Sequence, residues 1–348
     1  MPKPERILIV SDAWHPQING VVRTLAMVAD RLTALGDEVC VIGPDRFRTL
    51  PCPTYPEIRL AIGGGARLRR MIEAFSPDAL HIATEGPLGL TAARIACTLG
   101  MAFTTAYHTR FPDYVAARLM VPRRLSYAWL RRFHRRGAGV MVATAALGGE
   151  LAARGFDKTI LWSRGVDATL FHPDRAITLP YQRPIFLSVG RLAVEKNLPA
   201  FLDLDLPGSK LIVGDGPARA ALERRYAGPH THFLGAKQGV DLASHFASAD
   251  VFVFPSRTDT FGLVVLEALA SGTPVAAYPV AGPRDIIAGA DPEVGRLDDD
   301  LRAACLHALT INRVDCRHFA AQHSWEACAR LFRKNLVTIA SAPATSLN

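Results

Sequence analysis

Short runs of apolar residues alternate with longer amphipathic stretches along the whole chain. The runs are three to six residues long and rich in Val, Ile, Leu and Phe, which is typical of strands buried on both faces of a parallel sheet. They predict strands at 6–11, 38–42, 79–83, 102–107, 139–143, 185–189, 210–213, 231–235, 251–254 and 275–277. Several intervening stretches repeat apolar positions every three to four residues and predict helices at 21–35, 90–99, 145–153 and 218–226. This alternation of strand and helix predicts a doubly wound α/β fold.

The pattern breaks over residues 171–184. This segment carries three prolines and no apolar periodicity, so we expect a hinge there. It separates an N-terminal domain, 1–170, from a C-terminal domain, 185–323, and an amphipathic helix follows within 324–340. With 348 residues the chain is long enough for two domains with separate cores.

One strand–helix element, residues 249–275, carries two carboxylates. Asp259 lies in the polar loop after the strand, and Glu267 lies inside the helix, eight positions later. Eight residues at about 100° each make two turns plus about 80°, so both carboxylates can face one side if the helix begins near Asp259. A helix-capping Asp and a salt-bridged Glu would explain the spacing equally well. Gly262 lets a ligand approach the first helical turn, where unpaired amides favour phosphate.

This element resembles the E-x₇-E signature of retaining glycosyltransferases of the GT-B type, in particular glycosyltransferase family four. The resemblance implies two Rossmann-like domains facing an interdomain cleft, with a nucleotide sugar, GDP-mannose or a UDP-sugar, on the C-terminal domain. It implies that Asp259 contacts the hydroxyls of the donor sugar and that Glu267 holds the nucleotide ribose. The remaining donor-site residues that it implies here are Phe261, Gly262 and Leu263. An Asp stands where the family has its first Glu, and the helix after residue 324 is expected to cross back to the N-terminal domain.

Two further loops of the C-terminal half resemble the same family. Arg191 and Lys196 lie in the string GRLAVEKN after strand 185–189, and two cations five residues apart suit a leaving diphosphate. The string resembles the donor-diphosphate loop of the family. Gly214 begins a Gly-Asp-Gly-Pro turn that resembles the loop beside the nucleotide, with a plain tight turn as the alternative.

The N-terminal half has two candidate loops of its own. The loop 12–20 ends at Gly20, which opens a helix as in a Rossmann-like unit and resembles the family's loop at the cleft, although a simple tight turn would also explain it. His108 and Arg110 follow strand 102–107, at the carboxyl end where parallel sheets place ligands. The pattern Tyr-His-Thr-x-Phe-Pro resembles the acceptor-side loop of lipid-directed members, in which the His lies near the scissile bond. That role therefore falls on His108, with a purely structural histidine as the alternative.

All the excess positive charge lies in the N-terminal half. Lys and Arg outnumber Asp and Glu by 22 to 14 over residues 1–170 and equal them at 18 over residues 171–348. Seven arginines lie between 118 and 136, beside Tyr127 and Trp129. This mixture is typical of a helix on an anionic membrane surface, and a solvated face of an ordinary helix is the alternative. We assign acceptor or membrane contacts to Arg110, Arg124, Arg131, Arg132 and Arg135.

Other sequence features bear on where the protein works. No apolar run reaches the roughly 20 residues of a membrane span, and the N-terminus does not have the pattern of a signal peptide. The six cysteines are scattered without a Cys-x-x-Cys pair, which favours reduced thiols. We therefore expect a cytoplasmic protein, peripheral on the inner face of the cytoplasmic membrane, and no motif predicts nucleic-acid binding.

The resemblance implies a retaining hexosyltransferase with a nucleotide sugar as donor, and together with the basic stretch it predicts a lipid acceptor such as diacylglycerol or a phospholipid. The alternatives are an enzyme acting on a soluble or polysaccharide acceptor, a nucleotide-sugar epimerase of related architecture, and a non-catalytic nucleotide-sugar-binding protein. Two Asp-x-Asp triplets, 203–205 and 298–300, match the metal signature of a different glycosyltransferase fold. Because such short patterns arise by chance, we expect neither a metal nor another cofactor. The oligomeric state stays open.

Overall fold

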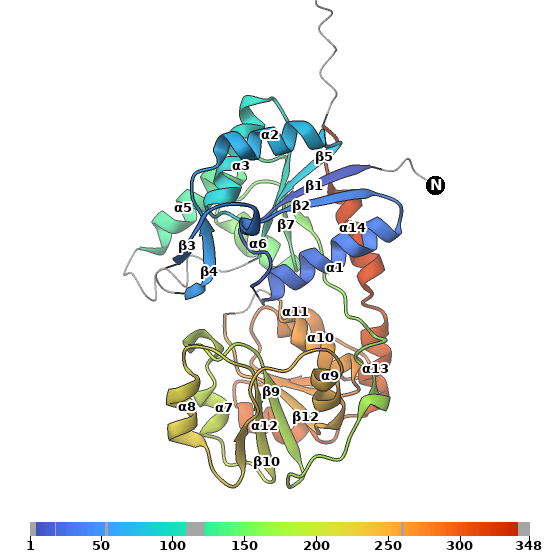
Figure 1. The fold of residues 1–348 in the computed structure, drawn as a ribbon. Coiled ribbons are helices and arrows are strands. Elements are labelled where there is room, and N and C mark those ends of the chain that lie inside the picture. The colour runs from blue at the N-terminus through green and yellow to red at the C-terminus, as the bar shows by residue number, and fades with distance from the viewer. Residues whose placement is uncertain (1–4, 18, 53–54, 109–121, 259–260, 340–348) are drawn as a thin grey trace, which may run out of the picture. The chain divides into compact units, whose positions relative to one another are not determined.

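The chain folds into two α/β units. The structure, a computed structural model, describes residues 5–17, 19–52, 55–108, 122–258 and 261–339 (Figure 1). Unit 1 comprises residues 1–163 and 326–348, and unit 2 comprises residues 164–325. The division falls between Ser163 and Arg164, so the segment 171–184, which we expected to be a hinge, lies wholly within unit 2.

Unit 1 is built on a six-stranded parallel sheet with the order β2-β1-β5-β6-β7-β8. Its strands are β1 (Arg6–Val10), β2 (Glu38–Ile42), β5 (Ala79–Ile82), β6 (Thr104–Tyr107), β7 (Gly139–Val142) and β8 (Thr159–Leu161). Its helices include α1 (Gly20–Ala34), α2 (Gly65–Phe75), α3 (Pro87–Thr98), α5 (Arg123–His134) and α6 (Ala145–Ala153). Since β1 pairs with β2 on one side and β5 on the other, the loops after β1 and β5 diverge at their carboxyl ends, which is where such sheets bind ligands.

An antiparallel hairpin and α2 occupy a stretch of unit 1 for which the apolar pattern predicts no element. The hairpin consists of β3 (Thr49–Cys52) and β4 (Tyr55–Ala61), and a short 3₁₀ helix, η1 (Pro44–Arg46), precedes it. Pro51 and Pro56 lie within its strands, and proline inside a run argues against a strand because it cannot donate to a ladder. A two-stranded ribbon outside the main sheet tolerates both.

Helix α14 (Trp325–Asn335) returns to unit 1, as expected for the helix after residue 324. The ring of Phe332 packs 4.8 Å from Trp162 and 4.9 Å from His81, measured between centroids. On the polar side, the Arg333 guanidinium bonds the buried Asp37 carboxylate at 2.8 Å. An apolar anchor and an ion pair therefore hold this distant segment against the N-terminal sheet.

Unit 2 repeats the architecture with a second six-stranded parallel sheet, in the order β11-β10-β9-β12-β13-β14. Its strands are β9 (Ile185–Val189), β10 (Ser209–Val213), β11 (Thr231–Phe233), β12 (Val251–Phe254), β13 (Val275–Ala277) and β14 (Gly295–Leu297). Its helices are α7 (Pro199–Leu202), α8 (Arg219–Tyr226), α9 (Gly239–Ser248), α10 (Leu263–Ala270), α11 (Pro283–Ile287), α12 (Leu301–Ala308) and α13 (Arg313–Ala321), with 3₁₀ helices η2 (Pro173–Arg175) and η3 (Val194–Lys196). The strand order reverses between β9 and β12.

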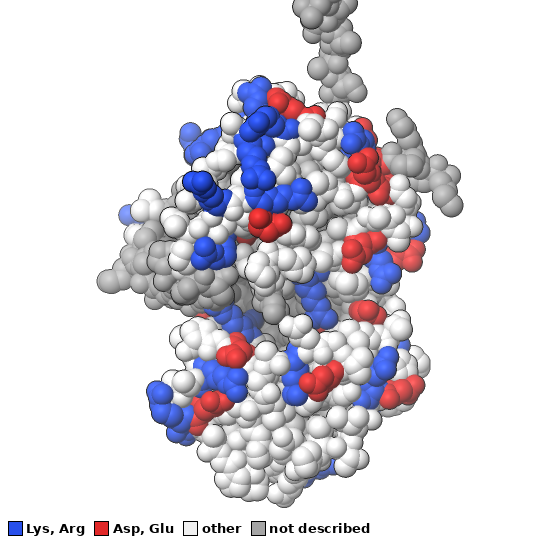
Figure 2. Space-filling model, viewed as in Figure 1, with Lys and Arg blue, Asp and Glu red and all other residues white. Residues whose placement is uncertain are grey.

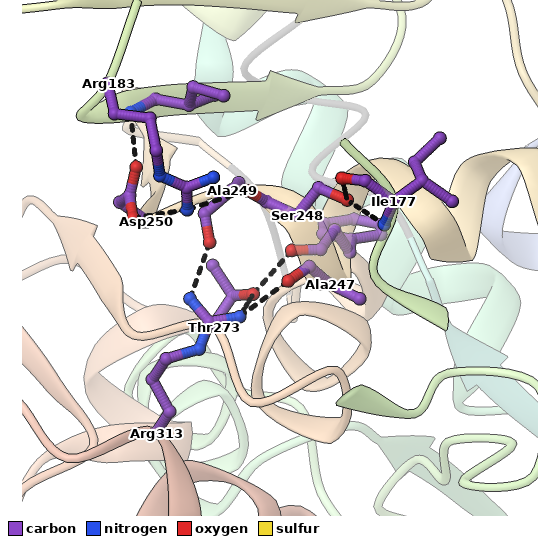
Figure 3. Close-up of polar contacts among 10 residues, drawn as sticks. Ile177, Arg183, Ala247, Ser248, Ala249, Asp250, Thr273 and Arg313 are labelled. Atoms are coloured by element: carbon purple, nitrogen blue, oxygen red, sulfur yellow. Dashed lines mark hydrogen bonds and ion pairs between the residues drawn. The ribbon is translucent and has the colours of Figure 1, made fainter. Parts of the chain in front are cut away.

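The segment 171–184 is fastened to the carboxyl end of α9 (Figure 3). The Ser248 hydroxyl donates to the carbonyl of Ile177 at 2.9 Å and accepts from its amide at 2.8 Å. Arg183 adds an ion pair of 2.7 Å to Asp250. These bonds tie the segment to the end of α9 and to the residue before β12, both of which belong to unit 2.

Candidate functional site

A small cavity lies where the strand order of unit 2 reverses. Its volume is about 20 Å³, room for about one water molecule, so the cavity itself cannot enclose a larger ligand. Residues from the ends of β9 and β12 and from the loops after them line it: Ser188, Val189, Gly190, Arg191, Leu192, Lys196, Leu198, Ile212, Phe254, Pro255 and Ser256. The two cations assigned from sequence to a leaving diphosphate are thereby brought to one pocket.

Glycine fixes the loop that carries Arg191. Gly214 has a φ of 146°, and a side chain there would collide with the carbonyl oxygen of Gly190. The amide of Leu192 donates to the carbonyl of Asp215 at 2.8 Å. The backbones of the loops after β9 and β10 therefore approach closely only if residue 214 is a glycine. This requirement holds whether or not Gly214 contacts a nucleotide.

Lys196 ends the 3₁₀ turn η3, and neighbouring residues tie this turn to the loop after β12. Asn197 has a left-handed backbone, with φ of 53°, and its side-chain amide donates to the carbonyl of Pro255 at 3.1 Å. The hydroxyl of Ser256 donates to the carbonyl of Glu195 at 3.3 Å. Sequence reasoning passed over both Asn197 and Ser256, although they hold the turn that positions Lys196.

Glu267 is buried inside α10, with 3% of its surface exposed. Gly262 precedes this helix with a left-handed φ of 86°, and a side chain there would press within 3.1 Å of the Phe254 ring. Phe261 is buried and Leu263 half-buried at the start of the helix. Asp259, the other member of the predicted acidic pair, lies outside the described residues, so the pairing stays a prediction.

The strand order of unit 1 reverses beside a buried carboxylate. Asp12, just after β1, accepts hydrogen bonds from the amides of Leu88 at 2.8 Å and Gly89 at 3.1 Å and from the hydroxyl of Thr84 at 2.9 Å. Burial raises its pKa, and the two amide bonds oppose that shift. Asp12 thus caps α3 and pins the β1–α1 loop, at whose end the exposed Gly20 opens α1.

His108 directly follows β6 and packs edge-on against Trp162, with 5.7 Å between ring centroids. The carboxyl end of the strand therefore places it as expected. Arg110 lies outside the described residues, and its assignment stays a prediction.

Comparison with known proteins identifies the family. Residues 18–170 match the model of Glycosyltransferase Family 4, and residues 183–310 match that of Glycosyl transferases group 1. A GDP-mannose-dependent alpha-mannosyltransferase of Mycobacterium tuberculosis is 34% identical over 308 residues, which cover 81% of each chain. The chain belongs to glycosyltransferase family 4. This confirms the resemblance read from the acidic and basic motifs.

Two other proteins show how far the likeness extends within this glycosyltransferase family. The alpha-monoglucosyldiacylglycerol synthase of Streptococcus pneumoniae is 25% identical over 375 residues, covering 95% of this chain and 84% of that protein. The structure of sucrose-phosphate synthase from Thermosynechococcus elongatus superimposes with a TM-score of 0.70 at 20% identity, covering 94% of this chain and 98% of that one. The fold is thus that of GT-B glycosyltransferases, as predicted.

Helix α5 of this glycosyltransferase carries the basic stretch singled out from sequence. Two arginines of this stretch bond neighbouring loop atoms: Arg131 of α5 donates to the carbonyl of Arg154 at 3.1 Å, and Arg135, just after the helix, pairs with Asp157 at 3.2 Å. The helix nevertheless exposes large apolar side chains, Leu125 at 57% and Trp129 at 40%. The exposed arginines of this stretch are Arg124, Arg132, Arg135 and Arg136.

Basic side chains also gather elsewhere on the N-terminal unit of the glycosyltransferase. Figure 2 shows Lys and Arg side chains over α2, where Arg67, Arg69 and Arg70 are exposed. The positive charge of unit 1 is therefore not confined to α5. Among the described helices, none combines the length and apolar character that crossing a membrane requires. Over the same described part of the chain, His, Cys, Asp and Glu form no group of three suited to a metal ion.

Proposed function

We propose that this glycosyltransferase transfers a hexose, with retention, from GDP-mannose or a UDP-sugar to a membrane lipid such as diacylglycerol or a phospholipid. The observation that carries the donor half is the convergence of Arg191 and Lys196 on one pocket at the switch point of the C-terminal sheet. A guanidinium and an ammonium fixed at a helix-proximal loop suit the two phosphates of a nucleotide sugar.

The chemical step needs negative charge to be stabilised where it grows. When the bond from the sugar to the diphosphate lengthens, the sugar becomes oxocarbenium-like and the diphosphate gains charge. Cations already held in place, here Arg191 and Lys196, lower the barrier because they need not reorganise during the step. The same argument makes a metal ion unnecessary, so we propose a metal-independent transfer.

The acceptor half rests on α5. Leu125 and Trp129 are exposed on the same helix as the exposed Arg124 and Arg132, so apolar groups can enter a bilayer interface while guanidinium groups meet lipid phosphates. Each basic residue near an anionic bilayer contributes about 1 kcal/mol before screening. The name of the Streptococcus pneumoniae relative specifies a diacylglycerol product, which supports a lipid acceptor here. In this proposal unit 1 binds the acceptor and unit 2 the donor, on a protein peripheral to the inner face of the cytoplasmic membrane.

The test combines turnover with vesicle binding. Purified protein is incubated with GDP-mannose or UDP-glucose and with vesicles of phosphatidylglycerol that contain diacylglycerol, and glycolipid formation is measured. Sedimentation should show binding that needs anionic lipid and weakens with salt. Changing Arg124, Arg132, Leu125 and Trp129 to Gln should abolish sedimentation, whereas Gln at the exposed Arg225 of unit 2 should not.

Glycosylation of soluble sugars together with no binding to anionic vesicles would refute the lipid acceptor and favour the soluble-acceptor alternative. Donor binding without turnover on any acceptor would instead favour a binding protein.

A further inference from the structure

A carboxylate at the switch point of the N-terminal sheet belongs neither to the donor site nor to the membrane-binding helix proposed above. Glu85 follows β5, and its side chain is 16% exposed. The register of the sheet pairs Ile82, the last residue of β5, with Thr105 of β6, and Glu85 and His108 follow the carboxyl ends of these two neighbouring strands. Ligands of doubly wound sheets bind at this edge, where the loops after β1 and β5 part.

A buried histidine orients this carboxylate. His134, the last residue of α5, is 2% exposed, and its Nε2 lies 3.2 Å from Oε1 of Glu85. Its Nδ1 lies 2.9 Å from the hydroxyl of Thr105 on β6. Aromatic rings of Tyr107, Phe133 and Phe156 surround the imidazole, with centroids 6.2, 5.0 and 5.7 Å away.

The hydrogen count at this site commits one oxygen of Glu85. The Thr105 hydroxyl has a single hydrogen, which is directed either to Nδ1 of His134 or to the carbonyl of Gly139 at 3.2 Å. In the first case Nε2 carries the ring hydrogen and donates it to Glu85. In the second case Nδ1 would donate to Thr105 and leave the lone pair of Nε2 facing a lone pair of Oε1. The first arrangement, in which the ring donates to Oε1, is therefore the one that gives each of these atoms a partner.

The other oxygen, Oε2, makes no hydrogen bond among the residues that the structure describes. The neighbouring carboxylate does not compete for a ligand there, because the amides of Leu88 and Gly89 and the hydroxyl of Thr84 occupy Asp12. An accessible carboxylate oxygen is a strong acceptor of hydrogen bonds from hydroxyl groups.

We propose that Oε2 of Glu85 binds the hydroxyl of the incoming acceptor, and that His134 and Thr105 are positioning residues for this carboxylate. The inference rests on the proposed function and deepens it, because it names the group that recognises the hydroxyl of the acceptor. The attacking hydroxyl donates to Glu85 at the carboxyl edge of the sheet, where His108 follows the neighbouring strand β6.

The decisive variant is Glu85→Gln, which keeps the size of the side chain and removes its charge. A hydrogen bond to a charged group is worth about 1.5–3 kcal/mol, so the acceptor KM should rise about 10- to 150-fold. Diacylglycerol in phosphatidylglycerol vesicles is the membrane probe, and glycerol, compared with propan-1-ol, is the soluble one. The KM for the donor and the Tm should stay as in the wild type. Thr105→Val should weaken acceptor binding less, again without affecting the donor.

The matched control is Glu73→Gln. Glu73 is an exposed carboxylate of unit 1 that pairs with Arg69 on α2, and its loss should leave the acceptor KM unchanged. An unaltered acceptor KM in Glu85→Gln, or equal losses of acceptor and donor binding with a lowered Tm, would overturn the inference.

The rate of donor hydrolysis tests the role of Glu85 without an identified acceptor, because water then takes the place of the acceptor hydroxyl. Glu85→Gln should slow hydrolysis about tenfold or more while the Kd for the donor stays constant, by the same hydrogen-bond energy. Unchanged hydrolysis would overturn the role of Glu85 even if every lipid failed as an acceptor. Transfer to glycerol but not to diacylglycerol would refute the lipid acceptor alone.

Discussion

Replacing Lys196 with Ala tests the donor assignment directly. Lys196 lines the pocket with Arg191, so the variant removes one of two cations proposed to meet the leaving diphosphate. Removing one preorganised donor to developing negative charge costs about 2.7–4 kcal/mol, or roughly 100- to 1,000-fold in kcat. Folding should be little affected, since the bonds that fasten the turn come from Asn197 and Ser256, which remain.

The assay measures steady-state turnover with one nucleotide-sugar donor at a saturating concentration of acceptor. It determines kcat and the donor KM separately, and thermal melting checks folding. Arg225→Ala is the matched control: it removes a cation of the same unit whose side chain is 70% exposed and lies away from the pocket lining. A loss in kcat confined to Lys196→Ala supports transition-state stabilisation. A higher donor KM with normal kcat would show that Lys196 stabilises the bound donor and the transition state equally. Normal values of both would refute the donor assignment.

Three further predictions concern metal, pH and the N-terminal sheet. Incubation with EDTA should leave the initial rate largely intact, and strict dependence on Mn²⁺ or Mg²⁺ would instead assign a metal to one of the Asp-x-Asp triplets. Burial raises the pKa values of Cys305 and Cys316 from 9.0 to about 12, so the folded state keeps these protons longer than the unfolded chain. The free energy of unfolding should therefore fall as pH rises from about 9 towards 12, by up to about 1.4 kcal/mol per pH unit for each thiol. Denaturant melts at several alkaline pH values check this, and a slope unchanged in Cys305→Ala would contradict it. Asp12→Asn should lower the free energy of unfolding by about 1–3 kcal/mol, because one amide oxygen cannot accept from both Leu88 and Gly89; an unshifted Tm would show that this cap contributes nothing.

The sequence by itself was sufficient for the fold class and for most strands of both sheets. Strands buried on both faces must be apolar along their length, so they stand out as runs against amphipathic helices. The sequence also brought together Arg191 and Lys196, through the resemblance of the string GRLAVEKN to the donor-diphosphate loop of the family, and both residues line one pocket. By contrast, β14 was not predicted, since a three-residue strand with Arg296 at its centre has no apolar run.

Only the tertiary structure revealed the arrangement at the N-terminal sheet edge. Glu85, Thr105 and His134 come from a loop, a strand and a helix, and no local spacing relates residues as far apart as 85 and 134. The same holds for Asp12 and the start of α3, which are 76 residues apart at Leu88. Periodicity reports which face of an element is buried, whereas hydrogen bonds between elements depend on strand order and register. Those properties are decided by packing of the whole unit, which is why this carboxylate site became visible only in three dimensions.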